Sequence, residues 1–275
     1  MAVVRFNFLS RCLGRQVDVS AVIPSWTFTA AAKESVEQIY KVNRKNKVLI
    51  LLNGFSGDHT DYLNYTNVAR YAEDNQICVF MPSGLNSSYR DREDGDKMHS
   101  FVAEELLQVV RYMFPVSTKR KDTYIGGLSM GAAGASTIGL AHPEVFSKIF
   151  CMSGITSRPV GKKKVNLNWF GEGENLYTPG AMNGNKKFLN TKEDGWYSAK
   201  KIVTEGLQRP ELVLTIGDKD FLLESARAFR DYMNELNYKI TYEEVPGYGH
   251  EWDFWDLKLR EYLYNGCALK KKAGK

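Results

Sequence analysis

The segment Gly127-Leu128-Ser129-Met130-Gly131 has the spacing of a nucleophile elbow, GxSxG. In such an elbow a serine lies at the tip of a sharp turn between a strand and a helix, and the two glycines leave the room that this turn requires. The flanks agree, because residues 123–126 are typical of a strand and residues 132–136 are small. The motif therefore predicts Ser129 as a catalytic nucleophile.

A serine hydroxyl is a poor nucleophile at neutral pH and needs a base, usually a histidine that a carboxylate orients. In the strand, elbow and helix arrangement, the carboxylate and then the histidine follow the serine along the chain. Of the four histidines, His59 and His99 precede the serine. His142 follows it closely, before a proline, where ending a helix is a more natural role. His250, in a loop between the last predicted strand and helix, is therefore our expected base.

Two aspartates, Asp218 and Asp220, come just after the predicted strand 211–216. Catalytic groups of open parallel sheets gather in loops at the carboxyl ends of strands, so either aspartate could be the acid of a triad. Asp220 directly precedes the predicted helix 221–236 and could instead cap it, which would leave Asp218 as the acid. The residues alone leave both assignments open, and our preference for Asp220 depends chiefly on the family resemblance given below.

An oxyanion hole needs two backbone N–H groups that point at the developing negative charge. One is the amide of the residue after the nucleophile, Met130. The second should come from the loop that follows the predicted strand 48–52, which reads Asn53-Gly54-Phe55-Ser56-Gly57. Glycines let such a loop turn an amide inward. We expect Phe55 to be this donor, although the loop by itself could also be a simple tight turn.

The elements that must position these residues alternate along the chain. Alternation in 3–8 and 17–23, separated by Gly14, predicts an antiparallel opening pair. Later strands are predicted at 48–52, 77–81, 123–126, 148–152, 211–216 and 238–245, and helices at 62–71, 101–114, 221–236, 251–263 and from the elbow to residue 141. In the helix 101–114 the acidic residues Glu104 and Glu105 lie near the start, where the helix dipole favours them. This order predicts an α/β fold with a mostly parallel sheet covered by helices on both faces.

The alternation stops after Gly154, in a stretch rich in Asn, Gly and Lys with scattered aromatic residues. A structureless loop of this length would be anomalous in a compact domain. We therefore interpret residues 155–210 as a partly structured cap inserted into a single domain, 1–275, and expect it to line a pocket. An insertion that only covers the sheet is nearly as good an interpretation.

Composition excludes several other classes of protein. Hydrophobic content of 43% and charged content of 25% are those of an ordinary globular domain. The formal net charge is +5, and the basic tail 265–275 holds Lys270, Lys271, Lys272 and Lys275, so subtracting these four charges leaves +1 for the rest. A nearly neutral body argues against a nucleic-acid partner.

The sequence shows no clear targeting segment and no cysteine pattern typical of metal binding or disulfide bonds. The N-terminal segment has no apolar run followed by a cleavage site, and the longest apolar runs have strand length, so we expect neither a secretory signal nor a membrane span. The four cysteines are far apart and form no CxxC pair, which argues against a zinc site or a disulfide framework. A reducing cytoplasm fits these features.

The chain resembles the tributyrin esterase and esterase D branch of the α/β-hydrolase superfamily, which includes feruloyl and acetyl esterases and is related to S-formylglutathione hydrolases. The resemblance rests on the Gly14-Arg15 opening and on NGFSGDHTDYL, FPVSTKRKDTYIGGLSMGAAGA, GDKDFLLE and PGYGHEWDFW. It implies an α/β-hydrolase fold and a serine esterase that uses a Ser-His-Asp triad without a cofactor or metal. The family's acid is the residue before Phe221, which supports Asp220.

Two departures from the family pattern concern Asn53, where the family usually has histidine, and Ala132, where it has glycine. We expect Asn53 still to hold the oxyanion loop by hydrogen bonding. Together with Trp169 in the cap and Trp252 beside His250, it is also a candidate contact for substrate.

The resemblance implies a small-molecule ester with a short acyl chain or an aromatic acyl group such as ferulate. An S-formylglutathione hydrolase-like thioesterase would use the same triad, and a non-catalytic binding protein could keep the scaffold. The sequence is compatible with a homo-oligomer and does not specify an oligomeric state.

Overall fold

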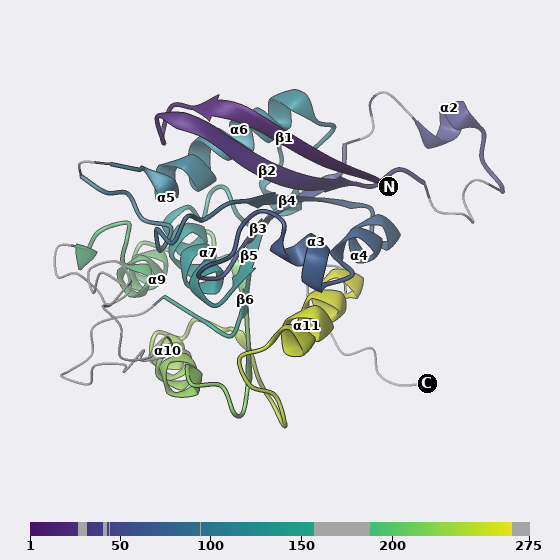
Figure 1. The fold of residues 1–275 in the computed structure, drawn as a ribbon. Helices are drawn as coiled ribbons and strands as arrows, with labels where there is room; N and C mark the ends of the chain where they lie inside the picture. Colours follow the sequence, from purple (N-terminus) through teal and green to yellow (C-terminus); the bar gives the residue numbers. More distant parts are fainter. Residues whose placement is uncertain (27–31, 41–42, 44, 94, 157–187, 266–275) are drawn as a thin grey trace.

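A computed structural model describes residues 1–26, 32–40, 43, 45–93, 95–156 and 188–265 of the chain (Figure 1). Within these residues the core is one eight-stranded sheet with the order β1-β2-β4-β3-β5-β6-β7-β8. Its strands are β1 (Ala2–Ser10), β2 (Arg15–Ile23), β3 (Lys47–Leu52), β4 (Ile77–Pro82), β5 (Thr123–Leu128), β6 (Lys148–Met152), β7 (Glu211–Gly217) and β8 (Thr241–Val245).

The opening pair is antiparallel and the rest of the sheet is parallel. β1 pairs with β2, β2 pairs with β4 in antiparallel register, and the strands from β4 to β8 run in the same direction. After β3, the chain forms β4 on one side of β3 and then β5 on the other side. The order in which successive strands are added to the sheet therefore reverses at β3. In open α/β sheets, ligands bind at the carboxyl ends of the strands at such a switch point.

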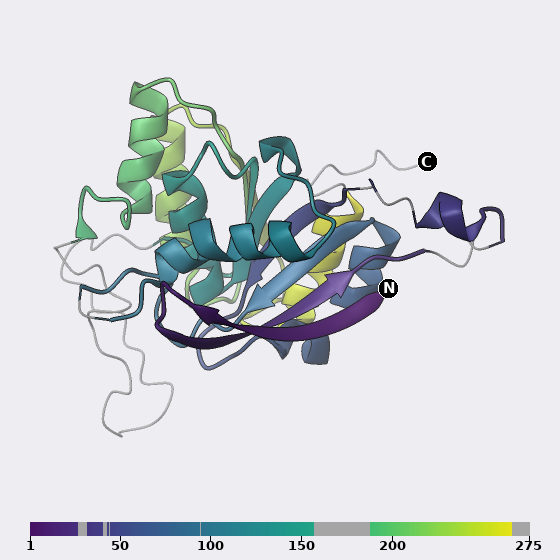
Figure 2. The ribbon, with the colours of Figure 1, turned by 90° about the horizontal axis from the view of Figure 1, so that it is seen from above.

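Helices cover both faces of the sheet (Figures 1 and 2). One face packs against α6 (Leu106–Met113), α7 (Met130–Ala141), α9 (Gly195–Thr204) and α10 (Leu223–Glu235). The other packs against α3 (Asp61–Tyr65), α4 (Val68–Asp74) and α11 (Trp252–Tyr264). Strand β3 alternates between the two cores, with Ile50 in the first and Leu49 and Leu51 in the second. This alternation explains why the central strands are continuous apolar runs.

The remaining elements are short. They are α2 (Val36–Ile39), α5 (Met98–Ser100), the π-helical turn η1 (Phe101–Glu105) and the 3-10 turn η2 (Arg120–Asp122). Two of them, α5 and η1, lead directly into α6 and contribute residues to the same core. Within the described residues, no helix has both the length and the apolar character needed to cross a bilayer.

The strands and most helices agree with the sequence prediction, and two helices differ. The predicted helix 62–71 is divided into α3 and α4 at Thr66, whose backbone is extended. The Thr66 hydroxyl donates to the carbonyl of Tyr62 and accepts from the amide of Val68, so it ends one helix and starts the next. A threonine side chain can compete for backbone hydrogen bonds in this way, which is why the helical pattern did not reveal the break.

The second difference is at the start of the predicted helix 101–114, which begins with η1 before α6. Glu105 accepts hydrogen bonds from the amides of Arg11 and Cys12 and from the hydroxyl of Ser10. Its carboxylate therefore holds the turn between β1 and β2, a role that the sequence analysis did not predict. The contact spans more than ninety residues of sequence, beyond the reach of a local pattern.

The region predicted as a cap is described only at its ends. Its second half contains α9, whose N-cap Asp194 accepts from the amides of Trp196 and Tyr197. Two segments lie outside the described part of the chain: residues 157–187, which include Trp169, and residues 266–275 of the basic tail. A cap role for 155–210 stays a prediction.

Candidate active site

Ser129 lies on the sharp turn between β5 and α7 that the GxSxG motif predicts. Its backbone has φ 52° and ψ −118°, a conformation that non-glycine residues rarely adopt. The backbone around it is closely packed: a Cβ on Gly131 would lie 2.1 Å from the carbonyl oxygen of Leu52, and one on Gly154 would lie 2.4 Å from that of Ser129. The glycines therefore let three chain segments meet at the serine.

The structure brings Ser129, His250 and Asp220 into one line of hydrogen bonds. Nε2 of His250 lies 2.9 Å from the Ser129 hydroxyl, and Nδ1 lies 2.9 Å from Oδ2 of Asp220. The histidine side chain is 8% exposed and the aspartate side chain is fully buried. A neutral imidazole that donates from Nδ1 to the carboxylate has its Nε2 lone pair available for the serine proton.

The sequence left open whether Asp218 or Asp220 is the acid, and the two side chains have different surroundings in the structure. Asp220 bonds to His250 through Oδ2 and accepts from the amide of Leu222 through Oδ1, at 2.9 Å in both contacts. Its carboxylate thus contacts both the histidine and the backbone just before α10, but the N-cap residue of that helix is Leu222 and not Asp220. Asp218 is exposed and accepts from the amide of Gly247, so it supports the turn that precedes His250.

The imidazole of His250 lies between two aromatic rings that sequence reasoning missed. The Phe221 ring is 4.6 Å from it between centroids, and the Trp255 ring is 5.0 Å away in an edge-to-face arrangement. These rings limit the tilt of the imidazole. Phe221 follows Asp220 directly, and Trp255 lies in the first turn of α11. Both residues are next to motifs that the sequence analysis used, but nothing in the sequence indicated that their rings contact His250.

The two expected oxyanion donors belong to chain segments that adjoin the serine. Met130 is the first residue of α7, and amides of a helix's first turn have no acceptor inside the helix. The loop with Phe55 touches the elbow, because a Cβ on Gly54 would lie 2.6 Å from Cδ1 of Leu128 and 3.6 Å from Cβ of Ser129. The oxyanion role of the Met130 and Phe55 amides stays a prediction.

The candidate substrate contacts have different surroundings. Asn53 is only 1% exposed, and its amide group is engaged by Gly54, Gly84 and Tyr89, an arrangement that fits the expected loop-holding role. Trp252 is partly exposed and stacks on Tyr65 with ring centroids 4.8 Å apart. Trp169 lies outside the described residues.

The other histidines lie elsewhere. His59 bonds to Ser20, and His142 is the C-cap residue of α7, as its position before a proline predicts. His99 is buried between Glu193 and His142. In the described ranges, no group of three or more His, Cys, Asp or Glu side chains has the arrangement of a metal site.

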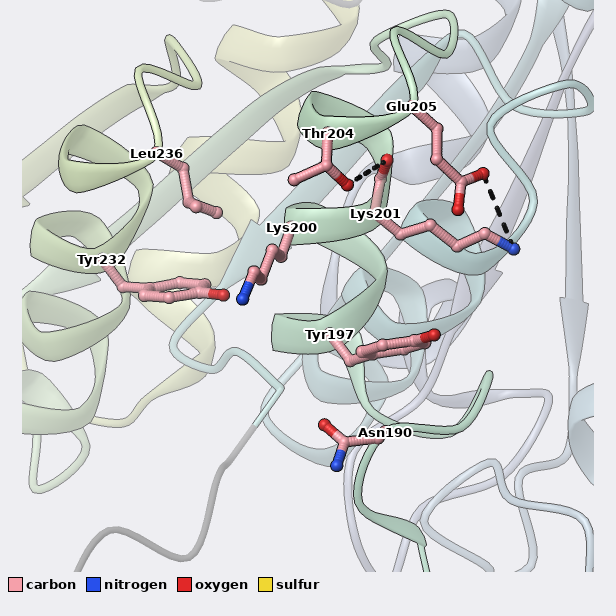
Figure 3. Close-up of a pocket in the computed structure, with 8 residues that line it drawn as sticks. All are labelled: Asn190, Tyr197, Lys200, Lys201, Thr204, Glu205, Tyr232 and Leu236. Carbon is pink, nitrogen blue, oxygen red and sulfur yellow. Dashed lines mark hydrogen bonds and ion pairs between the residues drawn. The ribbon is translucent and has the colours of Figure 1, made fainter.

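A pocket of about 360 Å³ lies between α9 and α10 (Figure 3). Its lining includes Tyr197, Lys200 and Tyr232, and none of its lining residues belongs to the Ser129, His250 and Asp220 group. The pocket is therefore distinct from the serine site, and we assign it no part in ester chemistry.

Comparisons with known proteins agree with this geometry. The family model described as "Putative esterase" matches residues 34–264. A protein of Caldicellulosiruptor saccharolyticus named as an acetyl esterase is 30% identical over 278 residues, which cover 99% of each chain.

Two solved structures from Staphylococcus aureus are also similar. The fluorophosphonate-binding serine hydrolase FphF has a TM-score of 0.79 at 25% identity, with 97% of this chain and 98% of the other covered. The S-formylglutathione hydrolase FrmB has a TM-score of 0.76 at 25% identity, with 97% and 99% covered. The fold is the α/β-hydrolase fold of these proteins. The family match, which spans most of the chain, shows that this protein belongs to the esterase family and is a carboxylic ester hydrolase.

Proposed function

We propose that the protein hydrolyses small carboxylic esters through an acyl-enzyme on Ser129. The observation that carries this proposal is the pair of 2.9 Å contacts that link the serine, His250 and Asp220. In the first half of the reaction, the Ser129 oxygen attacks the ester carbonyl carbon while Nε2 of His250 takes the hydroxyl proton. His250 then gives that proton to the leaving alcohol as the tetrahedral intermediate collapses.

Water completes the cycle by the same steps. His250 removes a proton from water, the resulting hydroxide attacks the acyl carbon, and the carboxylic acid leaves as Ser129 regains its proton. Asp220 holds the imidazole in the tautomer with a proton on Nδ1 and stabilises its charged form. The amides of Met130 and Phe55 stabilise the oxyanion in both halves of the reaction.

The relatives support two candidate classes of substrate. The similar protein named as an acetyl esterase supports a short acyl group. Partly exposed aromatic rings near the triad, Phe221 and Trp252, are compatible with an aromatic acyl group such as ferulate. The similarity to an S-formylglutathione hydrolase supports thioester hydrolysis as the second candidate activity.

The test is hydrolysis of p-nitrophenyl acetate, butyrate, octanoate and ferulate, side by side with S-formylglutathione. We expect turnover of the oxygen esters, fastest for the acetate or butyrate, and a loss of turnover in Ser129→Ala. Faster cleavage of the thioester would favour the second candidate. No turnover of any of these substrates, or an active Ser129→Ala protein, would contradict the proposal.

A further inference from the structure

The loop that follows β4, residues 83–90, is tied to the oxyanion loop by four contacts of hydrogen-bond length. The amide of Gly84 and the hydroxyl of Tyr89 lie 2.8 and 2.9 Å from Oδ1 of Asn53, and the same hydroxyl lies 3.1 Å from the carbonyl oxygen of Asn53. The amide of Ser56 donates to Oδ1 of Asn86 at 2.7 Å. Since Asn53 and Ser56 lie on either side of Gly54 and Phe55, the β4 loop holds both ends of the segment that carries the expected donor.

The side chain of Asn53 extends this link to the Phe55 amide itself. Its Nδ2 donates to the carbonyl of Gly54 at 2.7 Å. The Gly54 carbonyl and the Phe55 N–H belong to the same peptide unit, which is planar and trans, so fixing one fixes the direction of the other. A chain of contacts therefore runs from the Tyr89 hydroxyl through Asn53 to the N–H of Phe55.

The ring of Tyr89 contacts the helix that carries the other donor. Tyr89 is fully buried, and a Cβ on Gly134 of α7 would lie 2.5 Å from its Cδ2. A Cβ on Gly84 would lie 2.3 Å from its hydroxyl. Gly134 is about one helical turn beyond Met130, the first residue of α7. One side chain thus contacts both the oxyanion loop and α7, the two segments that carry the expected donors.

The backbone of the β4 loop is strained, as is that of the oxyanion loop. Leu85, Asn86, Ser88 and Tyr89 have φ between 53° and 55°, and Ser56 has φ 63°. Non-glycine residues hold such angles only where surrounding contacts require them, and such residues gather at functional sites. The run of four in one short loop indicates that this loop is shaped for a task.

The hydroxyl of Tyr89 is a neutral donor. Burial raises the pKa of Tyr89 well above its ordinary value, so the proton remains on the oxygen across the working range of an esterase. Asn53 Oδ1, in turn, receives two donors and has its orientation fixed, which assigns Nδ2 to the side that faces Gly54.

We propose that Tyr89 is a positioning residue that sets the direction of the Phe55 amide and its separation from the Met130 amide. This inference rests on the proposed acyl-enzyme mechanism and adds to it. Tyr89 does not touch the substrate. It acts through Asn53, and its contribution is greatest when the oxyanion forms, because that is when the direction of the donor matters.

The test is Tyr89→Phe, which keeps the ring against Gly134 and removes the hydroxyl. We expect kcat for p-nitrophenyl acetate to fall about tenfold with KM changed less than about twofold, since a displaced donor weakens the transition state more than the ground state. Rates are expressed per active site by burst titration, so that partial unfolding does not count as lost activity.

A trifluoromethyl ketone gives a second readout. Ser129 adds to its carbonyl carbon, the serine proton moves to His250, and the ketone oxygen takes the negative charge that the oxyanion donors bind. We expect its inhibition constant to rise in Tyr89→Phe by the same factor as kcat/KM falls. The pH profile of kcat/KM should keep its shape, because the His250 and Asp220 contacts are unchanged.

Two further variants make the test specific. Tyr238→Phe removes the hydroxyl of another buried tyrosine, which donates to the carbonyl of Pro210, and should leave kcat unchanged. Asn86→Gly keeps the left-handed backbone and removes the acceptor for Ser56, and should lower kcat several-fold even if Tyr89→Phe does not fold.

The outcomes separate the two proposals. An inactive Ser129→Ala together with full kcat and unchanged ketone inhibition in Tyr89→Phe would overturn the positioning role and leave the acyl-enzyme intact. An active Ser129→Ala would overturn the acyl-enzyme itself. Equal losses of kcat in Tyr89→Phe and Tyr238→Phe would mean that removing a buried tyrosine hydroxyl lowers the rate wherever it lies, which also overturns the positioning role.

Discussion

In the part of the chain that the structure describes, three histidines contact a carboxylate, and only one of them, His250, also contacts the hydroxyl of the elbow serine. His250 lies 2.9 Å from Asp220 and 2.9 Å from the elbow serine. His99 lies 3.2 Å from Glu193, and its other ring nitrogen lies 3.0 Å from a second imidazole, that of His142. Both centres have an acid and a histidine in contact, but they differ in the third group.

This difference teaches that an acid-histidine pair is not by itself a catalytic signature. His250 comes from the loop after β8, at the carboxyl edge of the parallel strands, where the strained turn presents Ser129. His99 lies in α5, with no exposed surface, beside the end of α7. The His99 and Glu193 pair connects α5 to the segment just before α9. We therefore interpret this second centre, formed by His99, Glu193 and His142, as a structural link between distant segments.

The largest expected contrast is between His250→Gln and His99→Gln. We expect His250→Gln to lower kcat for p-nitrophenyl acetate by about 10⁴-fold or more, because the serine loses its base. His99→Gln should keep kcat within about twofold and lower the free energy of unfolding by about 1–3 kcal/mol, the cost of disturbed buried hydrogen bonds. Steady-state kinetics and urea unfolding of both variants measure the contrast. A large loss of kcat in His99→Gln would mean that the second centre supports catalysis.

A smaller contrast separates the two aspartates of the loop after β7. Asp220→Asn should lower kcat by about 10³-fold to 10⁴-fold, because an amide in place of the carboxylate favours the wrong imidazole tautomer. Asp218→Asn keeps an acceptor for the amide of Gly247 and should cost less than about fivefold. The reverse ranking would move the acid to Asp218.

The smallest expected effect concerns stability and pH at the second centre. Burial, and next the neighbouring His99, lower the pKa of His142 from its ordinary value of 6.5. Lys192 also lowers it, Glu144 raises it, and Glu193 faces the far side of His99. Because the unfolded chain then binds the proton more tightly, the stability contributed here is present above about pH 6.5 and is lost as the pH falls below it.

The measurement is the urea midpoint of the wild type and of His142→Gln at several pH values between about 7.5 and 5.5. The wild type should lose stability toward the acid end, and the variant should lose less. Equal slopes would show that His142 does not contribute to the acid sensitivity.

Much of the fold and the central residues of the site could be predicted from the sequence. The predicted strand 148–152 has the same ends as β6, because a short apolar run between polar segments is typical of a buried strand. Ser129 and His250 were predicted because elbow geometry restricts the residues around the serine and because only four histidines were available. Asp220 needed the family resemblance, since one aspartate could both cap a helix and orient a histidine.

The residues that sequence reasoning missed depend on contacts between distant segments. Tyr89 is joined to Asn53 across 36 positions of sequence, and the role we propose for it depends on a left-handed backbone that no local pattern predicts. Glu105 was assigned to a helix dipole because its bonds to the β1 to β2 turn are invisible in a periodic pattern. Periodicity reports which face of an element is buried, and it does not report which loop a buried polar group will hold.

The most direct test of the central claim is to map the site of covalent labelling by a fluorophosphonate. Such a probe phosphonylates a serine whose proton a neighbouring base removes, and mass spectrometry of the digested protein locates the adduct. We expect one adduct, on Ser129, formed at the wild-type rate in His99→Gln and much more slowly in His250→Gln. An adduct on another serine, or equal labelling of the wild type and His250→Gln, would contradict the claim that His250 activates Ser129.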